Sequence, residues 1–257
     1  MRKFRIAAFA GAATLALTVP AIAQTPDRLQ TASLKVTPAK GGSAKKPKNA
    51  KLTLEFSVDP TSRTTADKIN YFLPKNTKLS GVGFPACSAD TINDQGIGAC
   101  KPASLVGTGE ADVSVGSTDV AGPPAAVPPF KVNVYAGGPK KLALYLYDGP
   151  AEVAAFDAPI TNAGGKFGQK IGVVIPAQAQ SVAGLDVYLT NLTTTIGGKK
   201  ATVRKKGKKK TVYFASLTGC PKTKSHLGAV SIGFVANQSS TESGTSNTVQ
   251  ATSPCKK

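Results

Sequence analysis

The stretch Lys51-Leu52-Thr53-Leu54-Glu55-Phe56-Ser57-Val58 decides the fold of this chain. Apolar and polar residues alternate along it without a break, which is the two-residue period of a β-strand with one buried and one solvated face. We therefore expect a strand here that covers a hydrophobic core.

The same alternation recurs through the rest of the chain. Leu142, Leu144 and Leu146 share one predicted face, with Tyr145 and Tyr147 on the other. Glycines 107 and 109 inside a further strand-like segment suggest a bulge or twist. Roughly ten to twelve strands separated by Gly, Pro and Asn turns predict an all-β fold, an antiparallel β-sandwich or jelly roll. The other strand-like segments are 33–37, 68–73, 78–84, 105–115, 130–134, 171–175, 185–189, 212–217 and 229–235.

A proline-rich segment, residues 122–129, divides this pattern. Proline donates no hydrogen bond to a strand ladder, so the segment cannot be a central strand. It is either a linker between two small β domains or a crossover between the sheets of one sandwich. Residues 51–121 and 130–257 are then the first and second halves of the β structure, and residues 24–50 are a basic, flexible N-terminal segment with a strand only at 33–37.

Residues 1–23 have the layout of a secretory signal peptide. Arg2, Lys3 and Arg5 precede an uncharged apolar run over 6–19, and Ala21-Ile22-Ala23 supplies the small residues of a cleavage site. The run is shorter than the ~20 residues that span a bilayer, and we expect no transmembrane anchor. Cleavage after Ala23 lowers the formal charge from +18 to +15, since it removes three positive residues. We expect a secreted protein, extracellular or in the cell envelope.

The chain has four cysteines, and an even number in an exported protein predicts two disulfides. Three pairings are possible. Cys87 with Cys100 and Cys220 with Cys255 are favoured, because each pair bounds a loop-like stretch. A metal site is not expected, since no Cys-x-x-Cys spacing occurs and His226 is the only histidine.

The residues needed for catalysis are scarce. Hydrolases with a serine or cysteine nucleophile need an imidazole base, and we expect His226 to be a surface or turn residue. The sequence thus predicts a non-enzymatic protein without cofactor. A carboxylate-based glycan hydrolase stays an alternative, although the absence of Trp argues against it. Its candidate carboxylates are Glu110, Asp112, Asp148, Glu152 and Asp157. A protein–protein adhesion module, which would show an exposed apolar patch, is a third possibility.

The sharpest surface feature is basic. Residues 199–210 carry eight positive side chains, and Gly207 between strand-like arms predicts a hairpin tip. Such a run attracts polyanions by salt-sensitive electrostatics, although a fringe of lysines that only aids solubility is the competing interpretation. We expect an anionic cell-wall polymer or a membrane surface as partner. Specific nucleic-acid binding is not expected, because Lys outnumbers Arg by 27 to five and no aromatic residues interleave the run. The predicted polyanion-binding residues are Lys199, Lys200, Arg204, Lys205, Lys206, Lys208, Lys209 and Lys210.

One segment resembles a known group. Phe84-Pro85-Ala86-Cys87-Ser88, followed by Gly98-Ala99-Cys100-Lys101-Pro102-Ala103-Ser104-Leu105-Val106-Gly107-Thr108-Gly109, is similar to the Cys-Ser…Cys-Pro-x-x-Ser-x-Val-Gly-x-Gly signature of secreted actinobacterial β-rich proteins of unassigned function. Lys101, between Cys100 and Pro102, departs from that signature. The resemblance implies export, β structure and disulfides, and it transfers no catalytic or ligand-binding residues.

Overall fold

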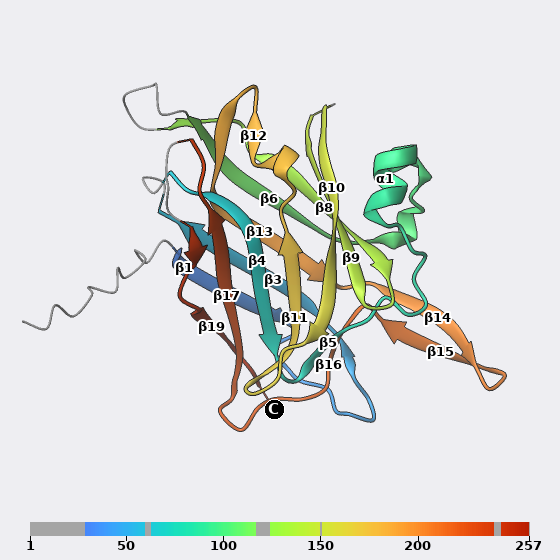
Figure 1. Ribbon diagram of the computed structural model, residues 1–257. Helices are drawn as coiled ribbons and strands as arrows, with labels where there is room; N and C mark the ends of the chain where they lie inside the picture. Colours follow the sequence, from blue (N-terminus) through green and yellow to red (C-terminus); the bar gives the residue numbers. More distant parts are fainter. Residues whose placement is uncertain (1–28, 60–62, 117–123, 150, 239–242, 257) are drawn as a thin grey trace, which may run out of the picture.

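The computed structural model describes residues 29–59, 63–116, 124–149, 151–238 and 243–256. The predicted signal peptide lies outside these residues. The protein is all-β and antiparallel, as the alternation predicts, and its main sheet curls into a half-barrel (Figure 1). The main sheet contains β1 (Leu29–Thr37), β3 (Lys51–Val58), β4 (Thr65–Pro74), β6 (Leu105–Gly116), β7 (Ala125–Ala126), β8 (Phe130–Gly138), β9 (Lys141–Asp148), β10 (Ala151–Asn162), β11 (Phe167–Val174), β12 (Ser181–Val182), β13 (Leu185–Gly197), β17 (Ser225–Val235), β18 (Gly244–Thr245) and β19 (Val249–Pro254).

The smaller elements are attached to this curled sheet. They are the three-stranded sheet of β2 (Lys48–Asn49), β16 (Ala215–Leu217) and β5 (Thr77–Leu79), the hairpin of β14 (Lys200–Lys205) and β15 (Lys208–Tyr213), the helix α1 (Ala89–Gln95), and the 3-10 turns η1 (Ile97–Ala99), η2 (Pro102–Ser104) and η3 (Ala177–Ala179). No helix among the described residues has the length and apolar character needed to cross a bilayer.

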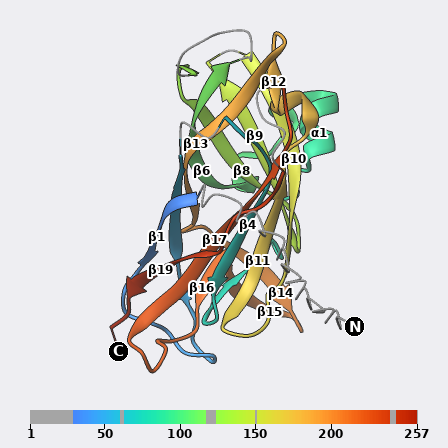
Figure 2. The ribbon, with the colours of Figure 1, turned by 60° about the vertical axis from the view of Figure 1, so that its left-hand side comes forward.

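The two edges of the main sheet come together. Its strand order is β1-β3-β13-β6-β8-β9-β10-β11-β4-β17, with β18 and β19 on the outer side of β17. The curl brings β19 against β1, where the Val36 amide donates to Ser253 Oγ at 3.0 Å and Lys40 forms a β-bridge with Lys256 (Figure 2). The sheet therefore wraps around a single core.

The sheet does not divide at the proline-rich segment. β6 lies between β13 and β8, and β4 lies between β11 and β17, so strands from before and after residues 122–129 are hydrogen-bonded to one another. The division into halves 51–121 and 130–257 thus has no counterpart in the sheet. Within the segment, the short strand β7 pairs with β6.

The N-terminal strand is longer than predicted. β1 begins at Leu29 and pairs with β3 along its length, so most of the expected flexible segment before residue 38 is strand. A register irregularity between Leu29 and Thr31 interrupts the alternation of buried residues, which is the signal that predicts strands.

The core fills the inside of the curl. Leu52, Leu54, Phe56 and Val58 are all buried there, as their alternation predicts. The predicted irregularity at the β6 glycines is also present: a Cβ on Gly107 would lie 2.4 Å from the Thr195 carbonyl oxygen. Only glycine allows β13 to approach β6 so closely.

Both disulfides have the favoured pairing. Cys87–Cys100 closes the loop that carries α1. This loop packs on the outer face of β8, β9 and β10, where Ile92 and Tyr145 share a second apolar cluster. Cys220–Cys255 joins the loop after β16 to the end of β19.

The half-barrel has two different ends. The first, called the hairpin end, holds the connections 138–141, 163–166 and 198–224. The second, called the open end, holds the connections 148–151 and 175–184. The three-stranded sheet covers the hairpin end with Leu79, Ala215 and Leu217, and Phe214, just before β16, is buried as well. No strand of that sheet lies at the open end, where η3 and β12 are found instead.

Candidate functional site

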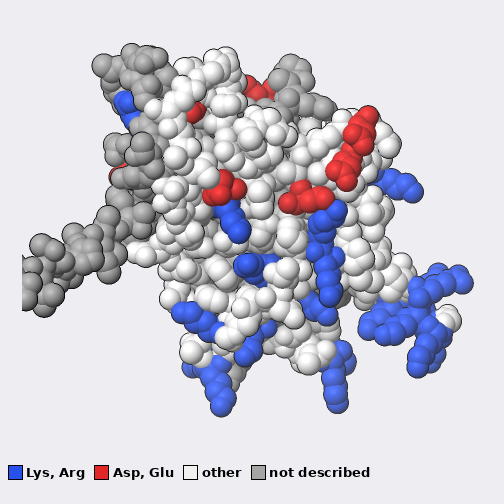
Figure 3. Space-filling view, viewed as in Figure 1, with Lys and Arg blue, Asp and Glu red and all other residues white. Residues whose placement is uncertain are grey.

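The basic run folds as predicted, into a two-stranded hairpin. β14 and β15 pair from Lys200 opposite Tyr213 to Lys205 opposite Lys208. Lys206 and Gly207 form the turn with φ of 51° and 75°, the positive values that a tight two-residue hairpin turn requires. The pair forms a sheet of its own and projects away from the body (Figures 1 and 3).

The positive charges surround this hairpin. Its eight cationic side chains are all exposed, and none is ion-paired to a residue in the part of the chain that the structure describes. The strand register places Lys205, Lys208 and Lys210 on one face, and Lys200, Arg204 and Lys209 on the other. The tip of the hairpin is therefore positively charged on both faces.

The root of the hairpin is packed, in contrast to its tip. Val203 and Val212 are half-buried against Gly83, where an added Cβ would lie 2.5 Å from Val203 Cγ1. The Ser80 amide donates to the Phe214 carbonyl at 2.8 Å, and the Phe214 ring meets Phe84 edge-on with centroids 5.5 Å apart. The root thus fixes where the charges are presented.

Other positive residues lie at the same end. Figure 3 shows lysines and arginines gathered around the hairpin end of this face and acidic residues toward the open end. Asp59, Asp148 and Asp186 lie at or beside the open end. Connections of the hairpin end carry Lys40, Lys45, Lys46, Lys48, Lys75, Lys140, Lys166 and Lys224.

His226 is buried in β17, and the expectation of a surface histidine is wrong. Its Nδ1 lies 3.1 Å from Asn76 Oδ1, and its Nε2 is buried without a hydrogen-bond partner among the described residues. Burial lowers the pKa of the imidazole, because the charged form is poorly solvated there. The alternation of β17 points the ring inward. The sequence pattern predicted a strand only over 229–235, so it left His226 outside the strand.

Three of the five candidate carboxylates make structural contacts on the outer face. Glu110 is ion-paired with Lys131, and Asp112 accepts a hydrogen bond from Asn191 Nδ2 at 3.2 Å. Asp157 pairs with Lys141 at 2.6 Å.

Asp148 and Asp157, two of the five candidate carboxylates, are far apart in the sheet, and the side chain of Glu152 lies outside the described part of the structure. Asp157 lies opposite Ala143, five positions along β9 from Asp148, or about 16 Å at the rise of a strand. That exceeds the ~5–9.5 Å between the carboxyl groups of glycoside hydrolases. In the described part of the chain, no three His, Cys, Asp or Glu side chains gather as metal ligands would.

The structure also contains an apolar site that the sequence did not reveal. An inner cavity of about 60 Å³ lies inside the half-barrel, between β4, β6, β8, β9, β10, β11 and β13. An outer pocket of about 430 Å³ adjoins it at the open end, and both are lined by Val113, Leu146, Ala179 and Val187. The small inward residues Ala66 and Ala111 leave room for the cavity. Their role can be recognised only when the curl of the sheet, which brings them to one interior, is known.

Searches of protein-family models, curated proteins and solved structures found no match to this chain. The resemblance of residues 84–109 to secreted actinobacterial proteins stays a prediction. In the structure, this segment contains the Cys87–Cys100 disulfide and the start of β6.

Proposed function

We propose that this protein is a secreted, non-enzymatic component of the cell envelope or extracellular space that binds anionic surface polymers through the β14–β15 hairpin. One observation carries the proposal: eight exposed cations without ion-pair partners in the described chain stand on a projecting hairpin with a packed root. The two disulfides fit an oxidising compartment.

The position of the lysines favours binding over edge protection. Lysines protect an exposed strand edge of a large sheet from pairing with another chain. β14 and β15 are not edge strands of the main sheet, and their charges extend over both faces and the turn.

The kind of cation indicates the kind of partner. Seven of the eight residues are lysines, which are strongly hydrated point charges on flexible stems. They suit the irregular phosphates of a wall polymer or of lipid headgroups better than planar groups that require the fork of an arginine.

The test compares two variants of the mature chain, residues 24–257, that carry the same net charge. The first changes Lys205, Lys206, Lys208 and Lys209 to Gln. The second, the control, changes Lys35, Lys51, Lys68 and Lys101 to Gln, which are exposed but dispersed over the body. Retention is measured on phosphate-bearing wall material and on anionic vesicles across a salt series.

We expect the hairpin variant to bind anionic vesicles up to about a thousandfold more weakly at low salt, since each of the four lysines near such a surface contributes about 1 kcal/mol. The control should lose much less, and added salt should abolish the difference. Equal losses would show that net charge, rather than the hairpin, drives retention, and the proposal would fail. Retention on only one of the two materials would identify the polymer.

A further inference from the structure

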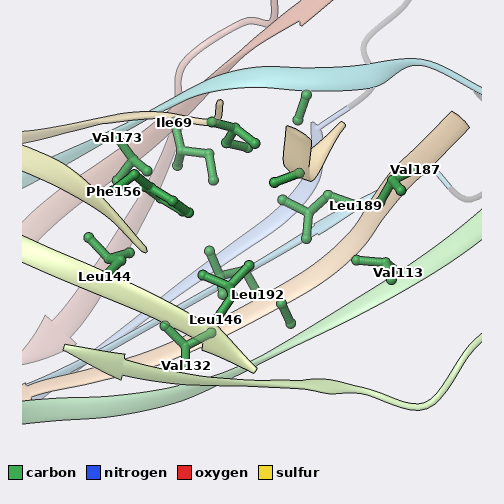
Figure 4. A pocket seen from close by; sticks show the side chains of 14 residues that line it. Ile69, Val113, Val132, Leu144, Leu146, Phe156, Val173, Val187, Leu189 and Leu192 are labelled. Atoms are coloured by element: carbon green, nitrogen blue, oxygen red, sulfur yellow. The ribbon is translucent and has the colours of Figure 1, made fainter. Parts of the chain in front are cut away.

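The inner cavity is lined by hydrocarbon side chains alone. Figure 4 shows residues from facing strands converging on it, among them Ile69 from β4, Leu144 from β9 and Leu192 from β13. A buried water needs two to four polar partners, and no polar side chain of the described residues lines this cavity. It therefore suits an apolar guest and not a water cluster.

The dimensions of the two spaces restrict the shape of that guest. The inner cavity, at about 60 Å³, is much smaller than the ~150 Å³ apolar cavity that holds benzene, so it admits the end of one chain and no ring. The outer pocket, at about 430 Å³, falls within the ~300–1,000 Å³ of small-molecule sites. Together they form a narrow inner space that continues into a wider one at the open end.

The lining of the outer pocket restricts the head group. Among the described residues, the polar side chains that line it are Asp148, Gln178 and Ser181, and none of those that line it is a Lys, Arg or His. An anionic head group would lie beside the Asp148 carboxylate without a compensating cation. A hydroxyl group would instead find oxygen acceptors, and a cationic group would be attracted by the Asp148 carboxylate.

We infer that this site binds a single-chain amphiphile, with the end of its tail in the inner cavity and the rest of the tail, with an uncharged or cationic head group, in the outer pocket. The inference does not depend on the hairpin. It also predicts an order of ligands opposite to the one that the overall positive charge would favour, because a protein of net charge +18 attracts anions.

The first experiment compares three probes of equal chain length below their micelle concentrations: decan-1-ol, decyltrimethylammonium and decanoate. Binding to the mature chain is followed by calorimetry and by the rise in unfolding temperature that a ligand of the folded state produces. We expect decan-1-ol and decyltrimethylammonium to bind, and decanoate to bind at least about tenfold more weakly, since repulsion of ~1.4 kcal/mol already has that effect. Decanoate binding as tightly as decan-1-ol would overturn the inference.

Two substitutions in one turn test the location. Ala179 of η3 lies where the two spaces meet, and Ala179→Phe should block the passage and weaken decan-1-ol binding at least about tenfold. Ala177→Phe is the matched control, because this exposed residue of the same turn lines neither space. Equal affinity in both variants would place the amphiphile elsewhere and overturn the inference.

A third variant tests the head-group rule without touching the core. Asp148 is exposed, so Asp148→Asn should leave the fold intact. It should strengthen decanoate binding severalfold and leave decan-1-ol binding unchanged. An unchanged ratio of decanoate to decan-1-ol affinity in this variant would contradict the role of Asp148. This result could be obtained even if Ala179→Phe failed to fold.

Discussion

The buried His226 shows how one residue connects two parts of the fold. Asn76 Nδ2 donates to the Gly219 carbonyl, so Asn76 Oδ1 is left to accept from the imidazole. We therefore assign the proton of the neutral ring to Nδ1, which leaves the buried Nε2 as a bare acceptor. A second proton would place a positive charge on an atom that no described group can stabilise.

This environment predicts that the protein loses stability as the pH falls through about 6.5. The folded-state pKa of His226 is lowered, so the unfolded chain takes up the proton first. The contribution is fully present above the unfolded pKa and declines below it. Urea unfolding midpoints between pH 7.5 and 5.5 should show the decline.

The control is His226→Phe, which removes the only histidine of the chain. Its unfolding midpoint should change little over the same pH range, whatever its absolute stability. An equal decline in the variant would assign the pH dependence to other groups.

At the scale of the element, the packing of the hairpin root depends on a glycine. Gly83 has a φ of +89°, and its missing side chain leaves room for Val203 and Val212. Gly83→Val should cost about 1–2 kcal/mol in backbone strain and also push the hairpin away. We expect trypsin to cleave within residues 204–210 much faster in this variant.

The matched control is Gly96→Val. Gly96 also has a positive φ, of 74°, but an added Cβ there would contact nothing within 4 Å. It should lose similar stability while the rate of hairpin cleavage stays that of the wild type. Faster cleavage in both variants would attribute the effect to general loosening.

Elements were predictable where the alternation is regular. β3, β9 and the β14–β15 hairpin lie where their patterns indicate, because each depends on local spacing and a local turn. β1 was predicted too short, since its irregularity near Thr31 shifts the buried positions. His226 points inward because β17 begins at Ser225. Gly228 interrupts the apolar alternation of that strand, so its first residues could not be recognised from the sequence.

At the scale of the whole molecule, the disulfides have different tasks. Cys220–Cys255 lies at the seam where β19 meets β1, whereas Cys87–Cys100 only closes the loop that carries α1 on the outer face. In the chain-entropy model, their separations of 35 and 13 residues correspond to about 4 and 3 kcal/mol. Both double Cys→Ser variants should therefore be less stable.

Hydrogen exchange distinguishes the two variants. Loss of Cys220–Cys255 should speed exchange in β1 and β19, because the seam opens locally. Loss of Cys87–Cys100 should speed it only in residues 87–100. Faster exchange at the seam in both would mean that the outer cover also stabilises the closure.

The curl of the main sheet could not be predicted from the sequence. Alternation shows that a strand has a buried face, but it does not say which strands are neighbours. The order β4-β17 and β13-β6 joins segments more than 70 residues apart, so the inner cavity and outer pocket could not be derived from local patterns. The lysine site could be, because it is contained in one hairpin.

β13 runs the length of the molecule, from beside the outer pocket at Leu185 to the base of the hairpin at Gly197. Its 13 residues span on the order of 40 Å, several times the ~8 Å over which charges are felt in physiological salt. A molecule bound to a wall polymer through the hairpin lysines would thus be oriented with its open end toward the surrounding medium. The charge of the surface would then not affect which amphiphile the open end binds, so surface binding and amphiphile binding would be independent of each other.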